Sequence, residues 1–392
     1  MSAKIRIFDT RKIKRENVRS ITLISVLLLL WILFTFFTSN YFSDFTGSFI
    51  SARNLSNLMR QMAIVGIMSS SMVLVIVTGG IDMSVGSVMG FCGVVAAYLM
   101  RFQDWPILRA VLVALIIGLL IGFMQGTAIA RTGVPPFIVT LSAQLIFRGA
   151  VVGITKGSTI APLSEKFLFI GQAYTSPTVG FSLAVVGAVS YALFKLRNKR
   201  KRLEYGLETS SQKDLIISIL SFSAFVFLAT YILNQYRGIP MPVIILIVSI
   251  LIFSFIAEAT KFGRRVYALG GNLTAAKYSG INVERTITWV YTLNGAMAAI
   301  AGLILAARLN AGTVSSGEGF ELDAIASCVI GGTSMSGGTG KVSGAIIGAL
   351  IMATITNGMS MMNLESYMQS IVKGIILFLA VLFDMLSSRK TS

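Results

Sequence analysis

The chain has 392 residues, of which 55% are hydrophobic and only 12% are charged, and its mean hydropathy is +0.79. Soluble domains carry about a quarter charged residues, so this composition excludes an ordinary soluble protein. The formal charge of +17 comes from basic residues at the ends of long apolar runs, which is the positive-inside pattern of membrane proteins and not a nucleic-acid-binding surface. We therefore expect an all-α, polytopic membrane protein with no nucleic-acid partner.

The chain contains no histidine and only two cysteines. Both cysteines, Cys92 and Cys328, stand in apolar surroundings, where they are expected to pack and to form no disulfide framework. Without histidine, metal sites and histidine-based catalysis lack their commonest residue. The sequence therefore predicts no metal site and no cofactor bound by this chain.

Apolar segments divide the chain into a membrane domain, residues 20–386, with a basic tail before it and a short tail after it, residues 1–19 and 387–392. We predict twelve segments, at about residues 20–38, 58–77, 84–100, 107–130, 137–155, 177–196, 215–233, 242–259, 287–309, 322–329, 342–356 and 368–386. The tenth is too short to span a bilayer, so we expect roughly ten to twelve transmembrane segments that include broken or re-entrant helices.

Alternate crossings place both tails and two internal loops on the cytoplasmic side. These loops are residues 197–214, which are rich in Lys and Arg, and residues 260–286, which contain Arg264, Arg265 and Arg285. Their positive charge agrees with this orientation, because basic loops are retained in the cytoplasm.

The second of these loops contains the pattern of a short helix. Asn272 is placed to cap its N-terminus, and Gly280 is placed to end it in a left-handed conformation. Leu273 and Ala276 would share one face, with Lys277 beside them. A short helix with small side chains suits docking into a groove of a partner protein. An ordinary loop between two membrane helices is the alternative interpretation.

Two glycine-rich stretches, GGIDMSVG from Gly79 and GGTSMSGG from Gly331, align without gaps, and each lies between apolar segments. Such a matched pair indicates two pseudo-repeated halves and a transport path built on broken helices. Glycines that allow close helix packing are the alternative. Asp82 is the one acid inside the breaks. The candidate residues in the breaks are Gly79, Gly80, Asp82, Ser84, Gly86, Gly331, Gly332, Ser336 and Gly338.

The stretch GGTGKVSG from Gly337 has part of the composition of a phosphate-binding loop. That motif needs a glycine five residues before Gly340 and a hydroxyl directly after Lys341, and this chain has Met335 and Val342 there. We therefore expect no ATP site in this chain.

Four blocks resemble those of one family. They are TGGIDMSVGSVMG from Thr78, PPFIVTL from Pro135, GRRVYALGGNLTAAKYSGINVERT from Gly263 and ELDAIASCVIGGTSMSGGTGKVSGAIIGA from Glu321. They are similar to the ribose/xylose/galactose-type permeases, the membrane subunits of ATP-binding-cassette sugar importers. The likeness runs through nearly the whole chain. The xylose permeases are nearest, and the permeases of several monosaccharides are close competitors.

The resemblance implies a non-enzymatic subunit of the bacterial cytoplasmic (inner) membrane that works as a homodimer among membrane lipids. A separate ATPase subunit would bind ATP and Mg²⁺ on the cytoplasmic side, and a periplasmic or lipid-anchored sugar-binding protein would deliver a monosaccharide, D-xylose first of all, from outside. The loop residues that the resemblance assigns to ATPase coupling are Arg264, Arg265, Gly270, Gly271, Asn272, Ala275, Ala276, Lys277, Ser279 and Gly280.

Polar side chains inside apolar segments are candidates for lining the sugar path: Gln125, Gln144, Asn294 and Asn357. Each has interhelical hydrogen bonding as its alternative role. On the outside, the candidate ion-pair partners of the sugar-binding protein are Arg237, Arg308, Glu318 and Glu321.

Two other classes of function remain open on the sequence. An ion-coupled secondary transporter also uses repeats and broken helices, but it needs titratable groups at mid-membrane, for which Asp82 alone is a poor basis. A passive channel would conduct without any energy source.

Overall fold

The computed structural model describes residues 10–38, 48–207, 209 and 211–389, and within these ranges it contains helices and no strand. The helices are α1 (Thr10–Thr38), α2 (Ala52–Val77), α3 (Val85–Phe102), α4 (Ile107–Thr132), α5 (Pro136–Thr155), α6 (Glu165–Gln172), α7 (Pro177–Glu204), α8 (Gln212–Asn234), α9 (Met241–Ala259), α10 (Lys261–Gly271), α11 (Leu273–Tyr278), α12 (Val283–Leu309), α13 (Phe320–Ile330), α14 (Val342–Met361) and α15 (Ser366–Arg389), with a 3-10 turn at Ser48–Ile50. The prediction of an all-α, polytopic membrane protein is confirmed, since ten of the described helices are long and apolar enough to cross a membrane.

The predicted segments all fall on helices, but the predicted tails and loops are more helical than expected. Helix α1 begins at Thr10, inside the tail 1–19, of which residues 1–9 lie outside the described part. Helix α7 continues to Glu204 through the basic residues of the loop 197–214. The loop 260–286 contains α10 as well as the expected short helix. Long basic side chains favour helix once a helix has begun, so charge alone does not end it.

Helix α13 has 11 residues and is half the length of a spanning helix, as the short tenth segment predicted. It runs into the second glycine-rich stretch and is followed by α14. Helices α2 and α3 flank the first stretch in the same way. The second stretch thus follows a half-length helix, whereas the first joins two helices that are each long enough to cross a membrane.

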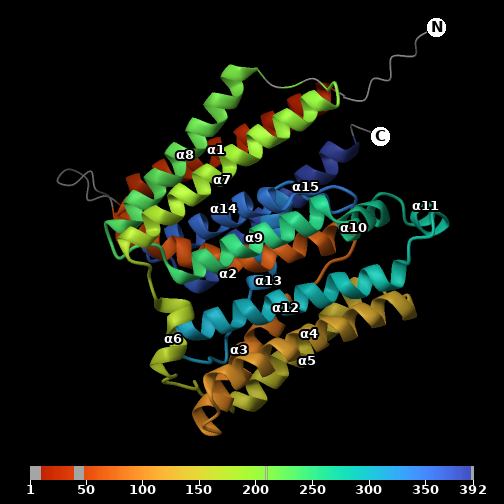
Figure 1. Ribbon diagram of the computed structural model, residues 1–392. Coiled ribbons are helices and arrows are strands. Elements are labelled where there is room, and N and C mark those ends of the chain that lie inside the picture. Colours follow the sequence, from red (N-terminus) through yellow and green to blue (C-terminus); the bar gives the residue numbers. More distant parts are fainter. Residues whose placement is uncertain (1–9, 39–47, 208, 210, 390–392) are drawn as a thin grey trace.

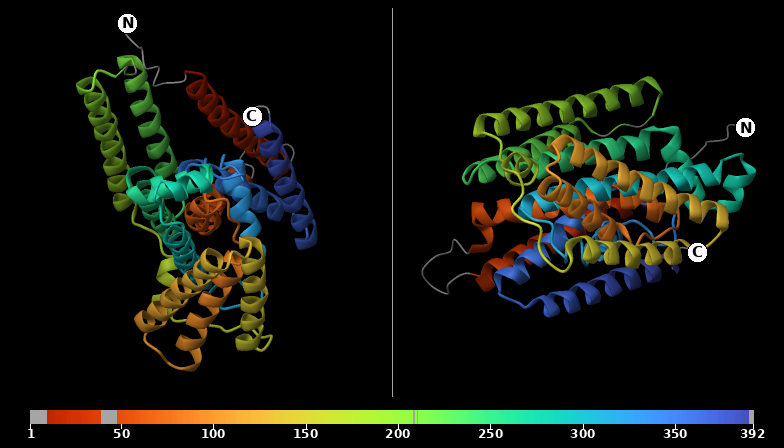
Figure 2. Two further views of the ribbon diagram at one scale, coloured as in Figure 1. Left: turned by 90° about the vertical axis from the view of Figure 1, so that its right-hand side faces the viewer. Right: turned by 90° about the horizontal axis from the view of Figure 1, so that it is seen from below.

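Helix α2 forms the centre of the bundle. Figure 2 shows it end-on in the left view, surrounded by other helices, and 89% of its most apolar window is buried. Helix α12 is nearly as enclosed, whereas α15 leaves most of its surface exposed. The bundle is therefore organised around α2 and α12, and the peripheral helices present apolar side chains outward, as a protein surrounded by lipid requires.

Helices α4 and α12 cross with their backbones in contact, and glycines make this possible. Gly118, Gly122 and Gly126 recur every four residues along α4. A Cβ atom added at Gly122 would lie 2.2 Å from the Tyr291 carbonyl oxygen, and one added at Gly295 would lie 2.2 Å from the Gly118 carbonyl oxygen. Small residues at such crossings give membrane helices their van der Waals attraction.

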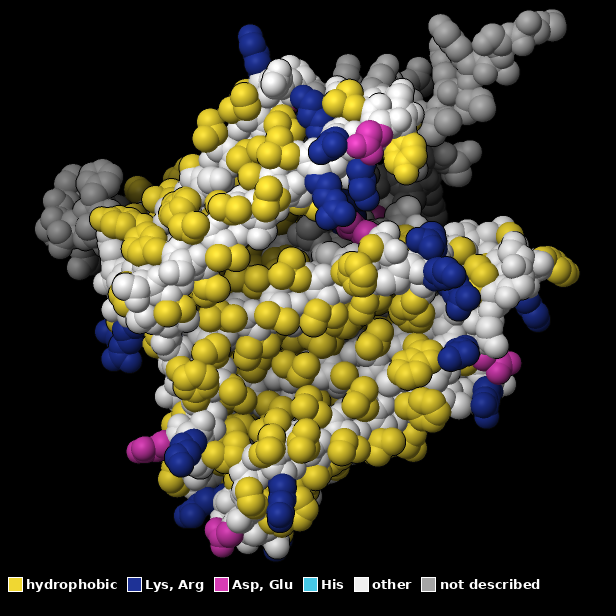
Figure 3. Space-filling view, viewed as in Figure 1, with side chains coloured by type: hydrophobic (Ala, Val, Ile, Leu, Met, Phe, Trp, Pro, Cys, Tyr) yellow, Lys and Arg dark blue, Asp and Glu magenta, His cyan; other side chains and the backbone are white. Residues whose placement is uncertain are grey.

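The bundle has two distinct ends. Helices α10 and α11 lie at one end, here called the α11 end, and α6 lies at the opposite end, called the α6 end (Figure 1). In the space-filling view of Figure 3, apolar side chains cover the flank, and Lys and Arg gather toward the ends. This belt is the surface expected of a chain that crosses a bilayer.

We predict that Gly122→Ala lowers the free energy of unfolding by about 1–3 kcal/mol, because the new methyl group forces the α4 and α12 backbones apart. Gly187→Ala on α7 is the matched control, since no atom lies within 4 Å of its added Cβ. Thermal unfolding in detergent measures both. Equal melting temperatures for the two variants would contradict the close crossing.

Candidate functional site

The predicted capped helix in the loop 260–286 is present as α11. The Asn272 side chain accepts a hydrogen bond from the Ala275 N–H at 2.9 Å, as an N-cap does. Gly280 follows the helix with a φ of +77°, the left-handed conformation that ends a helix readily at glycine. Ser279 lies between them and donates its hydroxyl to the Ala275 carbonyl oxygen at 2.9 Å. The local sequence therefore accounts for both ends of α11.

The exposed face of α11 differs from the face that the sequence predicted. Ala276 is buried against its own chain, so it does not share an exposed surface with Leu273. Leu273 and Tyr278 are instead 55% and 88% exposed, and Ala275 and Lys277 are exposed as well. In α10, Arg264 and Arg265 are both exposed. Two large apolar side chains with basic groups nearby form a surface that remains free for a partner.

The first break begins with a left-handed turn at the end of α2. Gly79 has a φ of +82° and donates its N–H to the Ile76 carbonyl oxygen at 2.8 Å. Gly80 donates its N–H to the Val75 carbonyl oxygen at 3.1 Å. This pair of bonds satisfies the last carbonyl groups of the helix and ends it.

The second break repeats this turn at the end of α13. Gly332 has a φ of +103° and bonds the Val329 carbonyl oxygen at 3.0 Å, and the Thr333 N–H bonds the Cys328 carbonyl oxygen at 2.9 Å. The turns are therefore equivalent when Gly79 is paired with Gly332, one residue away from the gapless alignment. Gly331 instead allows close packing on α14, since its added Cβ would lie 2.2 Å from the Gly344 carbonyl oxygen.

The two breaks meet each other and the end of α10 at one point, which we call the break junction: Val77, Gly79, Gly270, Gly271, Gly337 and Gly338. The Gly338 N–H donates a hydrogen bond of 2.9 Å to the Val77 carbonyl oxygen, which joins the second break to the first. A Cβ atom added at Gly270 would lie 1.6 Å from that same oxygen. Only glycine allows this approach, so the junction is made of backbone alone.

Tyr267 adds a second link between α10 and the second break. Its hydroxyl group donates a hydrogen bond of 2.8 Å to the Gly340 carbonyl oxygen. Burial raises the pKa of the Tyr267 phenol, and the nearby Glu258 carboxylate raises it further. The phenol therefore remains protonated and able to donate at any physiological pH. The pattern in the sequence gave no reason to select this residue.

Asp82 lies in the first break but is enclosed by protein. Its Oδ1 accepts hydrogen bonds from the Ser84 N–H at 2.8 Å and the Ser84 hydroxyl at 2.6 Å, and its Oδ2 accepts one from the Asn294 Nδ2 at 2.7 Å. Asn294 in turn accepts a bond from the Ser71 hydroxyl, and Gln125 donates one to the Ser84 hydroxyl. This network ties the break to α2, α4 and α12, so Asp82 positions the break.

The four candidate path residues are all engaged in hydrogen bonds within the chain. Gln125 and Asn294 belong to the Asp82 network, and Asn357 exchanges two side-chain hydrogen bonds with Asn54. These three are buried. Gln144 is only half-buried and donates to the Glu321 Oε1 at 3.0 Å. Of the four, Gln144 alone reaches an accessible surface.

The remaining break candidates have structural partners. A Cβ added at Gly86 would lie 2.1 Å from the Glu321 Oε2, so this glycine lets the first turn of α13 approach α3. The Ser336 N–H donates to the Ser334 hydroxyl within the second break at 3.3 Å. The described residues contain no group of three Asp, Glu, Cys or His side chains arranged to hold a metal ion.

Residues 54–381 match the family model described as branched-chain amino acid transport system / permease component. The chain belongs to this family. It is 45% identical to the xylose transport system permease protein of Escherichia coli, over 97% of the chain and 95% of that protein, and 45% identical to the same protein of Haemophilus influenzae, over 88% and 92%. It is 34% identical to the ribose import permease protein of Bacillus subtilis, over 86% of each chain. No solved structure matches the chain.

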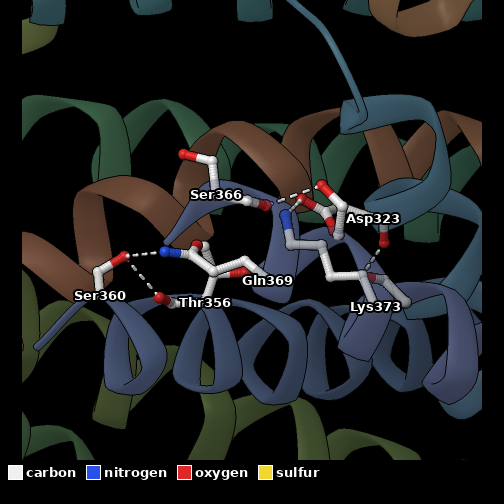
Figure 4. Close-up of polar contacts among 8 residues, drawn as sticks. Asp323, Thr356, Ser360, Ser366, Gln369 and Lys373 are labelled. Atoms are coloured by element: carbon white, nitrogen blue, oxygen red, sulfur yellow. Dashed lines mark hydrogen bonds and ion pairs between the residues drawn. The ribbon is translucent and has the colours of Figure 1, made fainter. Parts of the chain in front are cut away.

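In this permease-family chain, the first turn of α13 carries acids that bond in two directions. Glu321 accepts from Gln144 of α5, and Asp323 forms an ion pair of 2.8 Å with Lys373 of α15, which Figure 4 shows pointing at it. The Asp323 and Lys373 side chains are 7% and 19% exposed. The sequence offered one signal for this pair, because a charged residue inside an apolar segment is a candidate for function or pairing.

Helix α15 is also tied to the second break near its other end. The Asp384 Oδ2 accepts hydrogen bonds from the Met335 N–H at 3.1 Å and the Ser334 hydroxyl at 3.4 Å. Because α15 is largely exposed along its length, these polar ties at two levels attach it to the α13 half of the fold.

Three of the charged residues expected to meet the sugar-binding protein, Arg308, Glu318 and Glu321, bond within the chain. Glu318 forms an ion pair with Arg148 of α5, and Arg148 also donates to the Ser316 carbonyl oxygen at 3.4 Å. Arg308 donates to the Asn57 side chain at 3.3 Å. Arg148 was absent from the sequence-based candidates, although it too stands inside an apolar segment.

We predict that Lys373→Met lowers the free energy of unfolding by about 3–5 kcal/mol, because it leaves the Asp323 carboxylate buried without its partner. The double variant Lys373→Met/Asp323→Asn should recover most of this loss, since no buried charge remains. Denaturation of the purified protein in detergent measures both. A double variant that is no more stable than Lys373→Met would show that the pair does not act as a unit.

Proposed function

We propose that this chain is the membrane-spanning subunit of an ATP-driven importer for D-xylose. Family membership and 45% identity to xylose permeases along nearly the whole chain support the class of transporter and the sugar. The ribose permeases at 34% identity make another monosaccharide the alternative substrate. In this proposal the chain binds no nucleotide, and a separate ATPase with bound ATP and Mg²⁺ supplies the energy.

The observation that carries the mechanism is the break junction. An ATPase that moves the exposed surface of α11 pulls on α10, whose last glycines lie against both breaks. Because the contacts are backbone to backbone, α10 cannot shift without displacing Val77 or Gly338. In this proposal ATP binding favours one arrangement of the breaks and nucleotide release favours the other, which opens the path alternately to each side.

The proposal assigns the α11 end to the cytoplasm of a bacterial cell, in its inner membrane. Basic residues at this end, among them Arg264, Arg265 and Lys277, support that orientation. Both chain termini then lie in the cytoplasm, the sugar-binding protein approaches the α6 end, and two copies of the chain form the path with an ATPase beneath each.

The test is D-xylose uptake into liposomes by the purified chain, alone and with its ATPase and sugar-binding protein. We expect uptake only when ATP and both partners are present. Uptake by the chain alone under a proton or sodium gradient would contradict the proposal and establish an ion-coupled transporter. Flux without any energy source would establish a channel.

We predict that Ala275→Arg lowers the amount of ATPase that co-purifies by about tenfold, because a bulky charge enters a surface that must fit a groove. The control is Thr159→Arg, which places the same side chain on an exposed position at the α6 end. Undiminished co-purification of the ATPase with Ala275→Arg would show that α11 is not its docking element.

A further inference from the structure

The ion pair between Arg148 and Glu318 lies on the outside of this chain. The two side chains are 30% and 67% exposed. A second polar contact, between Gln144 of α5 and Glu321 of α13, lies one helical turn away along α5. The two contacts together form a polar stripe. On the same helix, Gly149 and Gly153 face open space, with no atom within 4 Å of an added Cβ. No other described element of the chain covers these two glycines.

This stripe lies well inside the membrane-spanning part of the bundle. Arg148 is seven residues from Thr155, where α5 ends, which corresponds to about 10 Å along a helix. The segment next to Glu318 lies at a similar level. A Cβ added at Gly90 would lie 2.1 Å from the Ser316 carbonyl oxygen, and one added at Gly302 would lie 2.0 Å from the Met89 carbonyl oxygen. Gly302 is itself seven residues inside the end of α12.

Exposure of this stripe to the hydrocarbon of the bilayer would be energetically unfavourable. A charged side chain at the centre of a membrane helix costs about 2.5–3.5 kcal/mol on insertion scales, and glutamate is too short to extend its carboxylate to the bilayer surface from this level. Lipid-facing helices elsewhere in the chain carry apolar residues at comparable positions, such as Leu183 on α7. The exposed charges therefore require water or a polar partner beside them.

We propose that the face of α5 and the 313–319 loop lines the water-filled path that two copies of this chain form in the proposed function. In it, the Arg148–Glu318 pair forms a polar constriction that exchanges hydrogen bonds with the hydroxyl groups of a passing monosaccharide. This rests on the proposed function for the identity of the solute. Carboxylate, guanidinium and amide groups together offer both acceptors and donors, which is what a polyhydroxylated solute needs when it leaves bulk water. The path is thus located beside α5, away from the buried Asp82 network.

Thiol labelling tests the location of the path in the assembled transporter. The native cysteines are both buried, so they give no background. Gly149→Cys lies six residues inside the end of α5, and the control Leu183→Cys lies six residues inside the end of α7 and is 43% exposed in the native protein. We expect a membrane-impermeant thiol reagent added on the α6 side to label Gly149→Cys at least about tenfold faster, because only a hydrated thiol ionises and reacts.

Labelling of neither cysteine, of both at equal rates, or of Leu183→Cys alone would overturn the inference. If Gly149→Cys does not assemble, Gly153→Cys one turn nearer the α6 end takes its place with the same expected result. ATP-driven uptake by the unsubstituted complex is measured in parallel. Its absence would refute the proposed function, whereas normal uptake with an unlabelled Gly149→Cys would refute only the location of the path.

Charge exchange tests the constriction. Arg148→Glu and Glu318→Arg should each lower D-xylose uptake by about tenfold, because two like charges then repel each other where the ion pair stood on the wall of the path. The double variant restores opposite charges and should recover uptake to within a few-fold of the unsubstituted complex. Equal uptake by all three variants, or a double variant as poor as the singles, would show that the pair is not a constriction.

Discussion

One backbone hydrogen bond, from the Gly338 N–H to the Val77 carbonyl oxygen, joins the second glycine-rich break to the end of α2, where the first break begins. The backbone of Gly270 packs against that same oxygen. Side chains adjust their rotamers when a neighbour moves, but backbone groups in contact transmit displacement directly. A displacement of α10 therefore changes the geometry of both breaks.

The rest of the bundle consists of central helices packed rigidly around this junction and of a peripheral helix, α15, that is less tightly attached. Glycine contacts between α4 and α12, together with the Asp82 network, join the central helices around α2. Helix α13 also packs closely through glycine, since a Cβ atom added at Gly344 of α14 would lie 2.1 Å from the Gly331 carbonyl oxygen. Helix α15 is held differently, because it is largely exposed and is attached to α13 by the Lys373–Asp323 ion pair. Polar contacts can exchange partners more readily than a packed glycine crossing, so α15 is the element suited to rearrangement.

Much of the fold could be predicted from local sequence, because apolar length, helix caps and left-handed glycines act within a few residues. The spans, the short α13 and the Asn272 cap of α11 are of this kind. Helix α10 was not predicted, because its basic residues made the segment read as a polar loop although Val266 and Leu269 form a buried face. The one-residue offset between the breaks was invisible because either of two adjacent glycines can adopt a positive φ.

The candidate site was harder to predict, because it depends on which distant residues meet. The sequence selected Asn294 and Asp82 separately, but their hydrogen bond joins positions 212 residues apart. Ala276 was assigned to an exposed face and is buried, since the position of α11 on its neighbours, and not its own periodicity, decides which side is covered. Arg148 and Lys373 both form ion pairs in the structure. Charged residues within apolar segments would therefore have predicted the site better than the polar residues selected from the sequence.

The central claim is that a backbone contact at Gly270 transmits the motion of the ATPase to both breaks. The most direct measurement compares Gly270→Ala with Gly271→Ala in the assembled transporter, following ATP hydrolysis and D-xylose uptake together. Gly271 is the matched neighbour, because no atom lies within 4 Å of its added Cβ. We predict that Gly271→Ala leaves both rates unchanged, and that Gly270→Ala retains ATP hydrolysis but loses the uptake coupled to it. Normal uptake by Gly270→Ala would contradict the claim.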